Sequence, residues 1–88
     1  MNIYIGNIPP TIPEPEIEAL FRQFGEVESV RIVMEQNNVL SKGFGFVSMG
    51  DEDAGNRAIH SLDNKKFKEN YLEVSEAMSG YSDPRDLY

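Results

Sequence analysis

Hydrophobic and polar residues alternate along four short stretches of this chain and recur with helical spacing along two others. The alternation, with a period of two, predicts strands over residues 1–6, 27–34, 42–49 and 70–75. Apolar residues three and four positions apart predict helices over residues 14–24 and from about 51 to 62. The elements therefore follow the order strand–helix–strand–strand–helix–strand.

This order is the split βαβ arrangement of α+β proteins. It predicts a ferredoxin-like βαββαβ sandwich, in which a four-stranded antiparallel sheet carries two helices on one face and leaves the other face open. Residues 1–77 are expected to form this single domain. Residues 78–88 lack periodicity and are expected to form a flexible, acidic C-terminal tail.

The helix ends are marked by residues with distinct backbone preferences. Pro13 precedes the first helix, and Gly25 is expected to end it as a C-terminal cap. Asp51 is the expected N-cap of the second helix. Gly55 lies within that helix and should weaken it by up to about 1 kcal/mol relative to alanine.

The strand over residues 42–49 carries large aromatic side chains on its outward face. Alternation places Phe44 and Phe46 on one face with Lys42, and Val47 on the face toward the core. Phenylalanines that face water from a sheet are unfavourable unless a ligand covers them. Flat rings beside a cation suit unstacked bases on a phosphate backbone, so this strand indicates nucleic-acid binding.

The second strand brings a cation to the same face. Val27 begins its apolar set, and Val30 and Ile32 continue that set toward the core. Arg31 and Val33 then face outward with the aromatic rings. Arg31 is a candidate contact for a phosphate or a base, and a solvated strand charge is the alternative interpretation.

Residues 42–49 resemble the longer RNP motif of the RNA recognition motif (RRM) family, K/R-G-F/Y-G/A-F-V-x-F/Y. Seven of the eight positions fit, counting the free one, and Met49 replaces the final aromatic residue. Residues 3–8 (Ile-Tyr-Ile-Gly-Asn-Ile) are similar to the shorter RNP motif. The resemblance covers about residues 2–77 and implies a small RNA-binding protein of bacterial type, acting on single-stranded RNA in post-transcriptional regulation.

The resemblance also implies a set of RNA-binding residues, namely Tyr4, Asn7, Arg31, Lys42, Phe44 and Phe46. Tyr4 and Phe44 would stack on base faces, and Phe46 would pack against a sugar or a second base. Lys42 and Arg31 would neutralise phosphates. Stacking of only two or three nucleotides implies a modest affinity, about micromolar or weaker.

The charge of the chain argues against strong RNA binding. Eight basic and fifteen acidic residues give a net charge of −7. Residues 1–75 alone hold twelve acidic and seven basic residues, and 7 − 12 = −5. Glu73 would also face the open side, where RRM proteins often carry a basic or neutral residue. Because an acidic surface fits a basic protein partner, a protein–protein interaction module on the same fold is the alternative function.

Three other segments are candidates for contact with the RNA or with the aromatic face, and each has an alternative interpretation. Asn37 and Asn38 lie in a loop that flanks the RNA in RRM proteins, and residues 65–68 hold the one basic cluster; a plain turn and a solvated loop are the alternatives. The acidic tail, which contains Tyr81 and Tyr88, is a candidate to fold over the aromatic face and compete with RNA. Single-stranded DNA stays an alternative to RNA because stacking barely separates the two.

The sequence gives no indication of a catalytic site, a metal site or a membrane-spanning segment. There is no cysteine, and His60 is the only histidine, so no metal site or cofactor is expected. No nucleophile–base pair stands out, and an enzyme is not expected. No apolar run approaches the roughly 20 residues of a membrane span. A soluble, cytoplasmic monomer is the simplest expectation.

Overall fold

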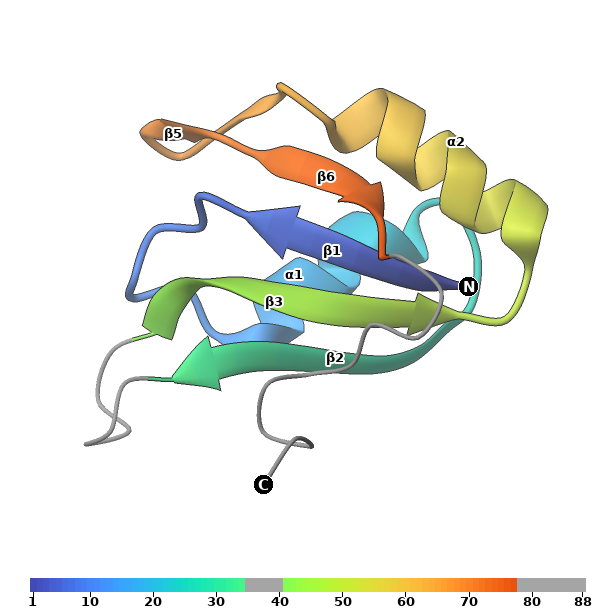
Figure 1. Ribbon diagram of the computed structural model, residues 1–88, viewed down its shortest axis with the longest axis horizontal. Helices are drawn as coiled ribbons and strands as arrows, with labels where there is room; N and C mark the ends of the chain where they lie inside the picture. The colour runs from blue at the N-terminus through green and yellow to red at the C-terminus, as the bar shows by residue number, and fades with distance from the viewer. Residues whose placement is uncertain (35–40, 78–88) are drawn as a thin grey trace.

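The computed structural model describes residues 1–34 and 41–77, and its elements follow the predicted order with one addition (Figure 1). The helices are α1 (Glu14–Arg22) and α2 (Glu52–Leu62). The strands are β1 (Asn2–Gly6), β2 (Val27–Met34), β3 (Ser41–Met49), β4 (Lys66–Phe67), β5 (Asn70–Tyr71) and β6 (Glu73–Glu76).

The addition is a short hairpin formed by β4 and β5, which pair with each other and not with the main sheet. The prediction of one strand over residues 70–75 is therefore wrong in extent, because the chain leaves the strand conformation at Leu72 between β5 and β6. Two-residue strands are too short to produce a recognisable alternation. The predicted Asn37–Asn38 turn and the proposed masking by residues 78–88 lie outside the described residues.

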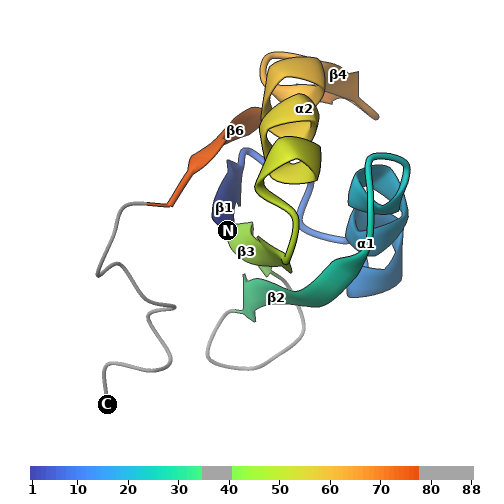
Figure 2. The same ribbon diagram turned by 90° about the vertical axis from the view of Figure 1, so that its right-hand side faces the viewer.

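Four strands form one antiparallel sheet in the order β2-β3-β1-β6. The central strands are β1 and β3, so residues far apart in the sequence become neighbours. Both helices lie on the same face of this sheet (Figure 2). The arrangement confirms the ferredoxin-like α+β fold, and we refer to the sheet face opposite the helices as the outer face.

The core lies between the sheet and the two helices. The buried side chains from the central strands are Ile3, Ile5, Val47 and Met49. Those from the helices are Ile17, Phe21, Ala54, Ala58 and Leu62. As predicted, Leu72 and Val74 are buried and Phe67 packs against the same cluster. Since alternate residues of β1 and β3 fill this core, the residues between them point to the outer face.

The end of α1 differs from the prediction. The helix begins directly after Pro13 and ends at Arg22, with Gln23 as the C-cap in right-handed helical conformation. Gly25 is therefore not the cap. A Cβ atom added to Gly25 would lie 2.7 Å from the Cβ of Ala54. The glycine is needed because the chain after α1 runs against α2 at this point.

The start of α2 agrees with the prediction, since the Asp51 side chain accepts a hydrogen bond of 2.9 Å from the Asp53 N–H. Gly55 is buried within the helix. A Cβ atom added there would lie 3.4 Å from Met1 Cγ and 3.6 Å from Ile3 Cδ1. The glycine, although it is expected to weaken the helix, allows α2 to approach the start of β1 closely.

The register of β2 against β3 shifts next to Val27 and again between Ile32 and Met34. The first shift explains how Val27 and Val30, three residues apart in a strand, both pack against the core. Val33 lies at the second shift and is only 5% exposed, although it is not part of the core cluster. Val33 is therefore covered, and its predicted position on the face that carries the aromatic rings stays a prediction.

Candidate nucleic-acid interface

Three aromatic side chains meet on the outer face where β1 and β3 pair. The register places Tyr4 opposite Phe46 and Gly6 opposite Phe44. The ring centroids of Tyr4 and Phe44 are 6.2 Å apart with an interplanar angle of 28°, a stacked geometry. The Phe46 ring lies edge-on to both, with centroids 6.0 Å from Tyr4 and 6.4 Å from Phe44. We call these three residues the aromatic triad.

The triad residues are half-buried, each less exposed than a bare strand phenylalanine would be. Rings that pack against one another in stacked and edge-on geometries cover part of each other's surface and gain about 0.5–1.5 kcal/mol per pair. Among the residues that the structure describes, Tyr71 is the one large hydrophobic side chain that is strongly exposed, at 59%. Mutual packing thus lowers the cost that the sequence pattern implied for outward-facing phenylalanines.

Two glycines of the RNP-like motifs shape this surface. A Cβ atom added to Gly6 would lie 2.9 Å from both Cε2 and Cζ of Tyr4, so the tyrosine ring lies over the Gly6 backbone. A Cβ atom added to Gly45 would lie 3.0 Å from the Cα of Ile32, which belongs to the neighbouring strand. Gly6 thus sets the position of one ring, and Gly45 sets the distance between β2 and β3.

A shallow pocket of about 440 Å³ opens at one end of the triad. Its lining residues are Tyr4, Asn7, Ile8, Pro10, Gly43, Phe44 and Glu73. The loop after β1 is held against β3 by a hydrogen bond of 2.8 Å from Ile8 N–H to the Gly43 carbonyl. Gly43 adopts a φ of 89°, which a residue with a side chain would rarely adopt. The rings of Tyr4 and Phe44, the loop after β1 and the Glu73 carboxylate therefore meet at this pocket.

Charges of both signs flank the triad. Arg31 is exposed and lies opposite Phe46 in the register of β2 and β3, as the alternation predicted. Lys42 belongs to β3, but its side chain lies outside the described part of the structure. Glu73 lies opposite Gly6 in the register of β1 and β6, and it is exposed as expected. The sequence thus placed Arg31 and Glu73 on the correct face.

A second acid on this face was not foreseen. Glu28 accepts a hydrogen bond of 2.9 Å from the hydroxyl of Ser48, which alternation places on the outer face with Phe46. Glu28 lies at the first register shift of β2, where simple alternation no longer predicts the face. The outer face therefore carries a carboxylate at each end of the triad.

The family model described as the RNA recognition motif matches residues 3–73, most of the chain, including both strands that carry the triad. The chain belongs to the RNA recognition motif family. RRM proteins are binding modules and not enzymes, which agrees with the expectation from the sequence.

Proteins similar to this RRM chain have RNA binding or ribonucleoprotein in their names. The chloroplastic 28 kDa ribonucleoprotein of Nicotiana sylvestris is 37% identical over 75 residues, which are 85% of this chain and 27% of that protein. The chain thus spans about a quarter of that relative's length. RbpB of Nostoc sp., whose name contains the words RNA-binding protein, is 32% identical over 88% of this chain and 75% of its own length. The crystal structure of RNA Binding Protein PG1 has a TM-score of 0.85 and 39% identity, covering 90% of this chain and 95% of that one.

Asn7, a predicted RNA-binding residue of this RRM, lines the pocket and also holds the hairpin in place. Its side-chain Nδ2 donates a hydrogen bond of 2.8 Å to the Tyr71 carbonyl, and its own carbonyl accepts one of 3.0 Å from Asn70 Nδ2. Its φ of 60° places it in the left-handed region, where asparagine is favoured among residues with side chains. A binding role for Asn7 stays a prediction, whereas its contact with the hairpin is a feature of the fold.

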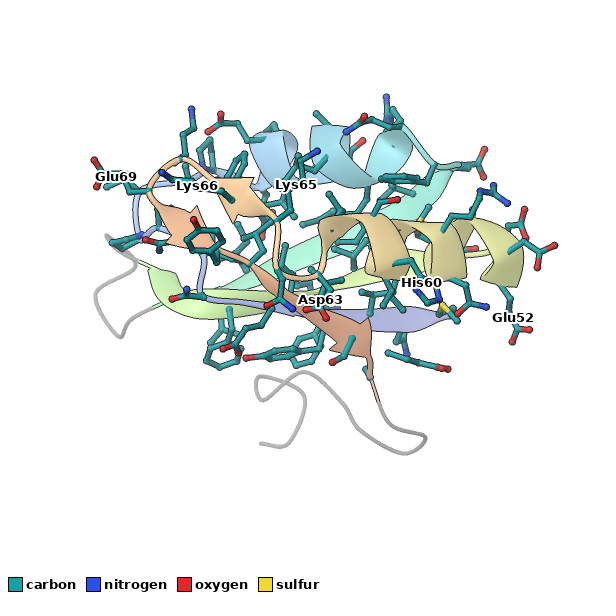
Figure 3. The ribbon with its side chains drawn as sticks, turned by 90° about the horizontal axis from the view of Figure 1, so that it is seen from above. Glu52, His60, Asp63, Lys65, Lys66 and Glu69 are labelled. Atoms are coloured by element: carbon teal, nitrogen blue, oxygen red, sulfur yellow. The ribbon has the colours of Figure 1, made fainter. Side chains whose placement is uncertain are left out.

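The basic cluster lies on the hairpin, away from the triad. Lys65 and Lys66 are exposed where the chain enters the hairpin, and Glu69 is exposed at its tip (Figure 3). Lys68 forms an ion pair of 3.6 Å with Glu16 and lies 5.8 Å from the ring centroid of Phe67. The charge of Lys68 is thus partly balanced by Glu16.

Residues 1–34 and 41–77 contain no group of three or more His, Asp or Glu side chains arranged to hold a metal ion. His60 is exposed on α2, as predicted (Figure 3). No helix in the same two segments has the length and apolar character needed to cross a bilayer.

Proposed function

We propose that this RRM binds single-stranded RNA by stacking two or three nucleotides on the aromatic triad. The observation that carries the proposal is the meeting of Tyr4, Phe44 and Phe46 on the two central strands, with ring centroids 6.0 to 6.4 Å apart. The family match and the names of the relatives support RNA as the ligand. Bases of unpaired RNA stack on such rings without requiring a fixed sequence.

Each triad residue has a distinct part in this proposal. Tyr4 and Phe44 offer ring faces at a shallow mutual angle, so successive bases can stack on them. Phe46 lies edge-on to both rings and would pack against a ribose or a further base. Arg31, beside Phe46 in the register, is the described cation best situated to neutralise a phosphate, and Lys42 is the second candidate.

The affinity should be modest because the charge of the chain opposes an anionic ligand. Each stacked base contributes about 1–3 kcal/mol by truncation, and ordering the RNA offsets part of this. We therefore expect dissociation constants in the micromolar range or weaker. With two phosphates neutralised, the logarithm of the affinity should fall with the logarithm of the salt concentration with a slope near −1.4, from roughly −0.7 per contact. A slope steeper than about −4 would contradict a mechanism based on stacking.

The test is the affinity of the wild-type chain, Phe44→Ala and Tyr71→Ala for a short fluorescent RNA of mixed sequence, measured by anisotropy at low salt. Phe44→Ala removes one stacking surface and should weaken binding by about tenfold. Tyr71→Ala removes an exposed ring that does not line the pocket and should leave the affinity unchanged. Equal affinities for all three proteins would refute the stacking proposal.

The same assay addresses the alternative functions. Unlabelled single-stranded DNA as a competitor measures how far the 2′-hydroxyl groups contribute, since stacking alone barely distinguishes DNA from RNA. If the wild-type chain binds neither nucleic acid, the net charge of −7 favours the protein–protein interaction module with a basic partner.

A further inference from the structure

A row of three residues crosses the outer face next to the pocket. Gly6 pairs with Phe44 on one side and with Glu73 on the other. Residues paired across adjacent strands have side chains on the same face, so Phe44 and Glu73 lie on either side of Gly6, whose backbone is buried. The ring of Tyr4 lies over Gly6, between them. A carboxylate therefore stands at the edge of the stacking surface and lines the same pocket as both rings.

This position fixes which part of a bound base Glu73 would meet. A base stacked on Tyr4 or Phe44 lies flat over the sheet, and its edge points sideways along the surface. Adjacent strands are about 4.8 Å apart, so a glutamate one strand away from Gly6 reaches the edge of a base stacked on the Tyr4 ring, which lies over Gly6. No hydrogen bond or ion pair within the described ranges engages the Glu73 carboxylate. The edge facing Glu73 would thus be read by a hydrogen-bond acceptor.

The four RNA bases differ strongly in what they offer to such an acceptor. An ionised carboxylate only accepts hydrogen bonds, and its two oxygens can accept from two parallel donors at once. Guanine presents two adjacent donors on its Watson–Crick edge, N1–H and the N2 amino group. Cytosine and adenine present one amino group beside a ring acceptor. Uracil presents a single N3–H between two carbonyl oxygens, and a carboxylate repels both of these oxygens.

We propose that Glu73 makes this pocket select guanine and discriminate against uracil, a property that rests on the proposed RNA binding at the same site. The carboxylate lowers the affinity for every RNA through its charge. RNA with guanine in the pocket regains the largest part of this affinity, because guanine alone supplies two charge-assisted hydrogen bonds. Glu73 is therefore a specificity-determining residue, and its negative charge has a function at the position where RRM proteins often carry a basic or neutral one.

The experiment compares the full chain and its variants on three RNA pentamers that differ at the central base: UUGUU, UUUUU and UUIUU, where I is inosine. Inosine keeps N1–H and lacks the N2 amino group. The wild-type chain should bind UUGUU about tenfold more tightly than UUUUU, within the range of a bidentate contact to a base. The affinity for UUIUU should lie between these two.

Glu73→Gln replaces one acceptor oxygen by a donor with little change in shape. It should strengthen binding of UUUUU, because a negative charge is lost, and bring the three affinities close together. Glu76→Gln is the control for net charge, since it removes the same charge from the same strand at an exposed position that lies outside the pocket and pairs with the core residue Ile3, on the other face of the sheet. It should strengthen binding of all three RNAs equally and preserve their ranking.

The proposal is overturned if the wild-type chain does not prefer guanine, or if Glu73→Gln retains the full preference. Loss of the preference in Glu76→Gln as well would also overturn it, because the effect would then be general charge and not a local contact. Phe44→Ala separates this proposal from the proposed function. If that variant binds all three RNAs as the wild type does, RNA binding by the triad fails; if it loses them while Glu73→Gln keeps the preference for guanine, only the role of Glu73 fails.

Discussion

Replacing Gly45 with alanine should open the sheet between β2 and β3. An added Cβ atom would lie 3.0 Å from Ile32 Cα and 3.2 Å from the carbonyl carbon of Arg31, and closer still to the Arg31 carbonyl oxygen. These are backbone atoms of β2, so no side-chain rotation relieves the overlap. The strand itself must move, and Gly45 lies between Phe44 and Phe46 of the triad.

The expected cost follows from the size of the overlap. Overpacking a well-ordered site by a methyl group costs about 1–3 kcal/mol, and a backbone obstacle places this case in the upper part of the range. Alanine recovers about 0.4–1 kcal/mol by restricting the unfolded chain. A net loss of about 2 kcal/mol in the free energy of unfolding remains, which for a domain of this size corresponds to a decrease in Tm of roughly 10 °C.

Urea and thermal unfolding followed by circular dichroism measure this loss. Gly50→Ala is the control, because its added Cβ would meet only the carboxylate of Glu28, at 2.9 Å, and that exposed side chain can turn away with the loss of only its exposed hydrogen bond from Ser48. The control should change stability by less than about 0.5 kcal/mol. If Gly45→Ala is as stable as Gly50→Ala, the close approach of the β2 backbone is not what requires glycine in this motif.

Two further substitutions test other contacts. Gly6→Ala places a methyl group against the Tyr4 ring, so it should weaken RNA binding several-fold in the anisotropy assay. The free energy of unfolding should change by less than about 1 kcal/mol, and unchanged RNA binding would show that the position of the ring does not matter. Asp63→Ala removes the carboxylate that accepts a 3.0 Å hydrogen bond from the Val74 N–H, and it should lower the free energy of unfolding in urea by about 1–3 kcal/mol. Asp63→Asn keeps an acceptor oxygen and should cost less, so equal losses in the two variants would contradict this role of the hydrogen bond.

The strands and the composition of the triad were predictable from the sequence because they depend on local alternation. A period of two fixes the face of Tyr4, Phe44 and Phe46 once Ile3 and Val47 are assigned to the core. The same rule correctly placed Arg31 and Glu73 on the outer face. Each of these assignments needs only neighbouring residues in the chain.

Other features depend on contacts between distant segments and could not be read in this way. Gly25 resembles a helix cap in the sequence, and only the position of Ala54 on α2 explains why a glycine is required there. The pocket needs the loop wall formed by Ile8 and Pro10, which is held by a bond to Gly43. The division of the last strand depends on a hairpin too short to produce a period. The pairing of Gly6 with both Phe44 and Glu73, which gives the pocket its acidic edge, appears only with the strand order.

The most direct test of the central claim is an amide NMR titration of the wild-type chain with short RNA of random sequence at low salt. Stacking on the triad predicts shifts concentrated on β1 and β3, around Tyr4, Phe44 and Phe46, and at the pocket residues, with α1 and α2 little affected. The same titration of Phe44→Ala should lose these shifts. Shifts confined to the helices, or a response of Phe44→Ala equal to that of the wild type, would contradict the account.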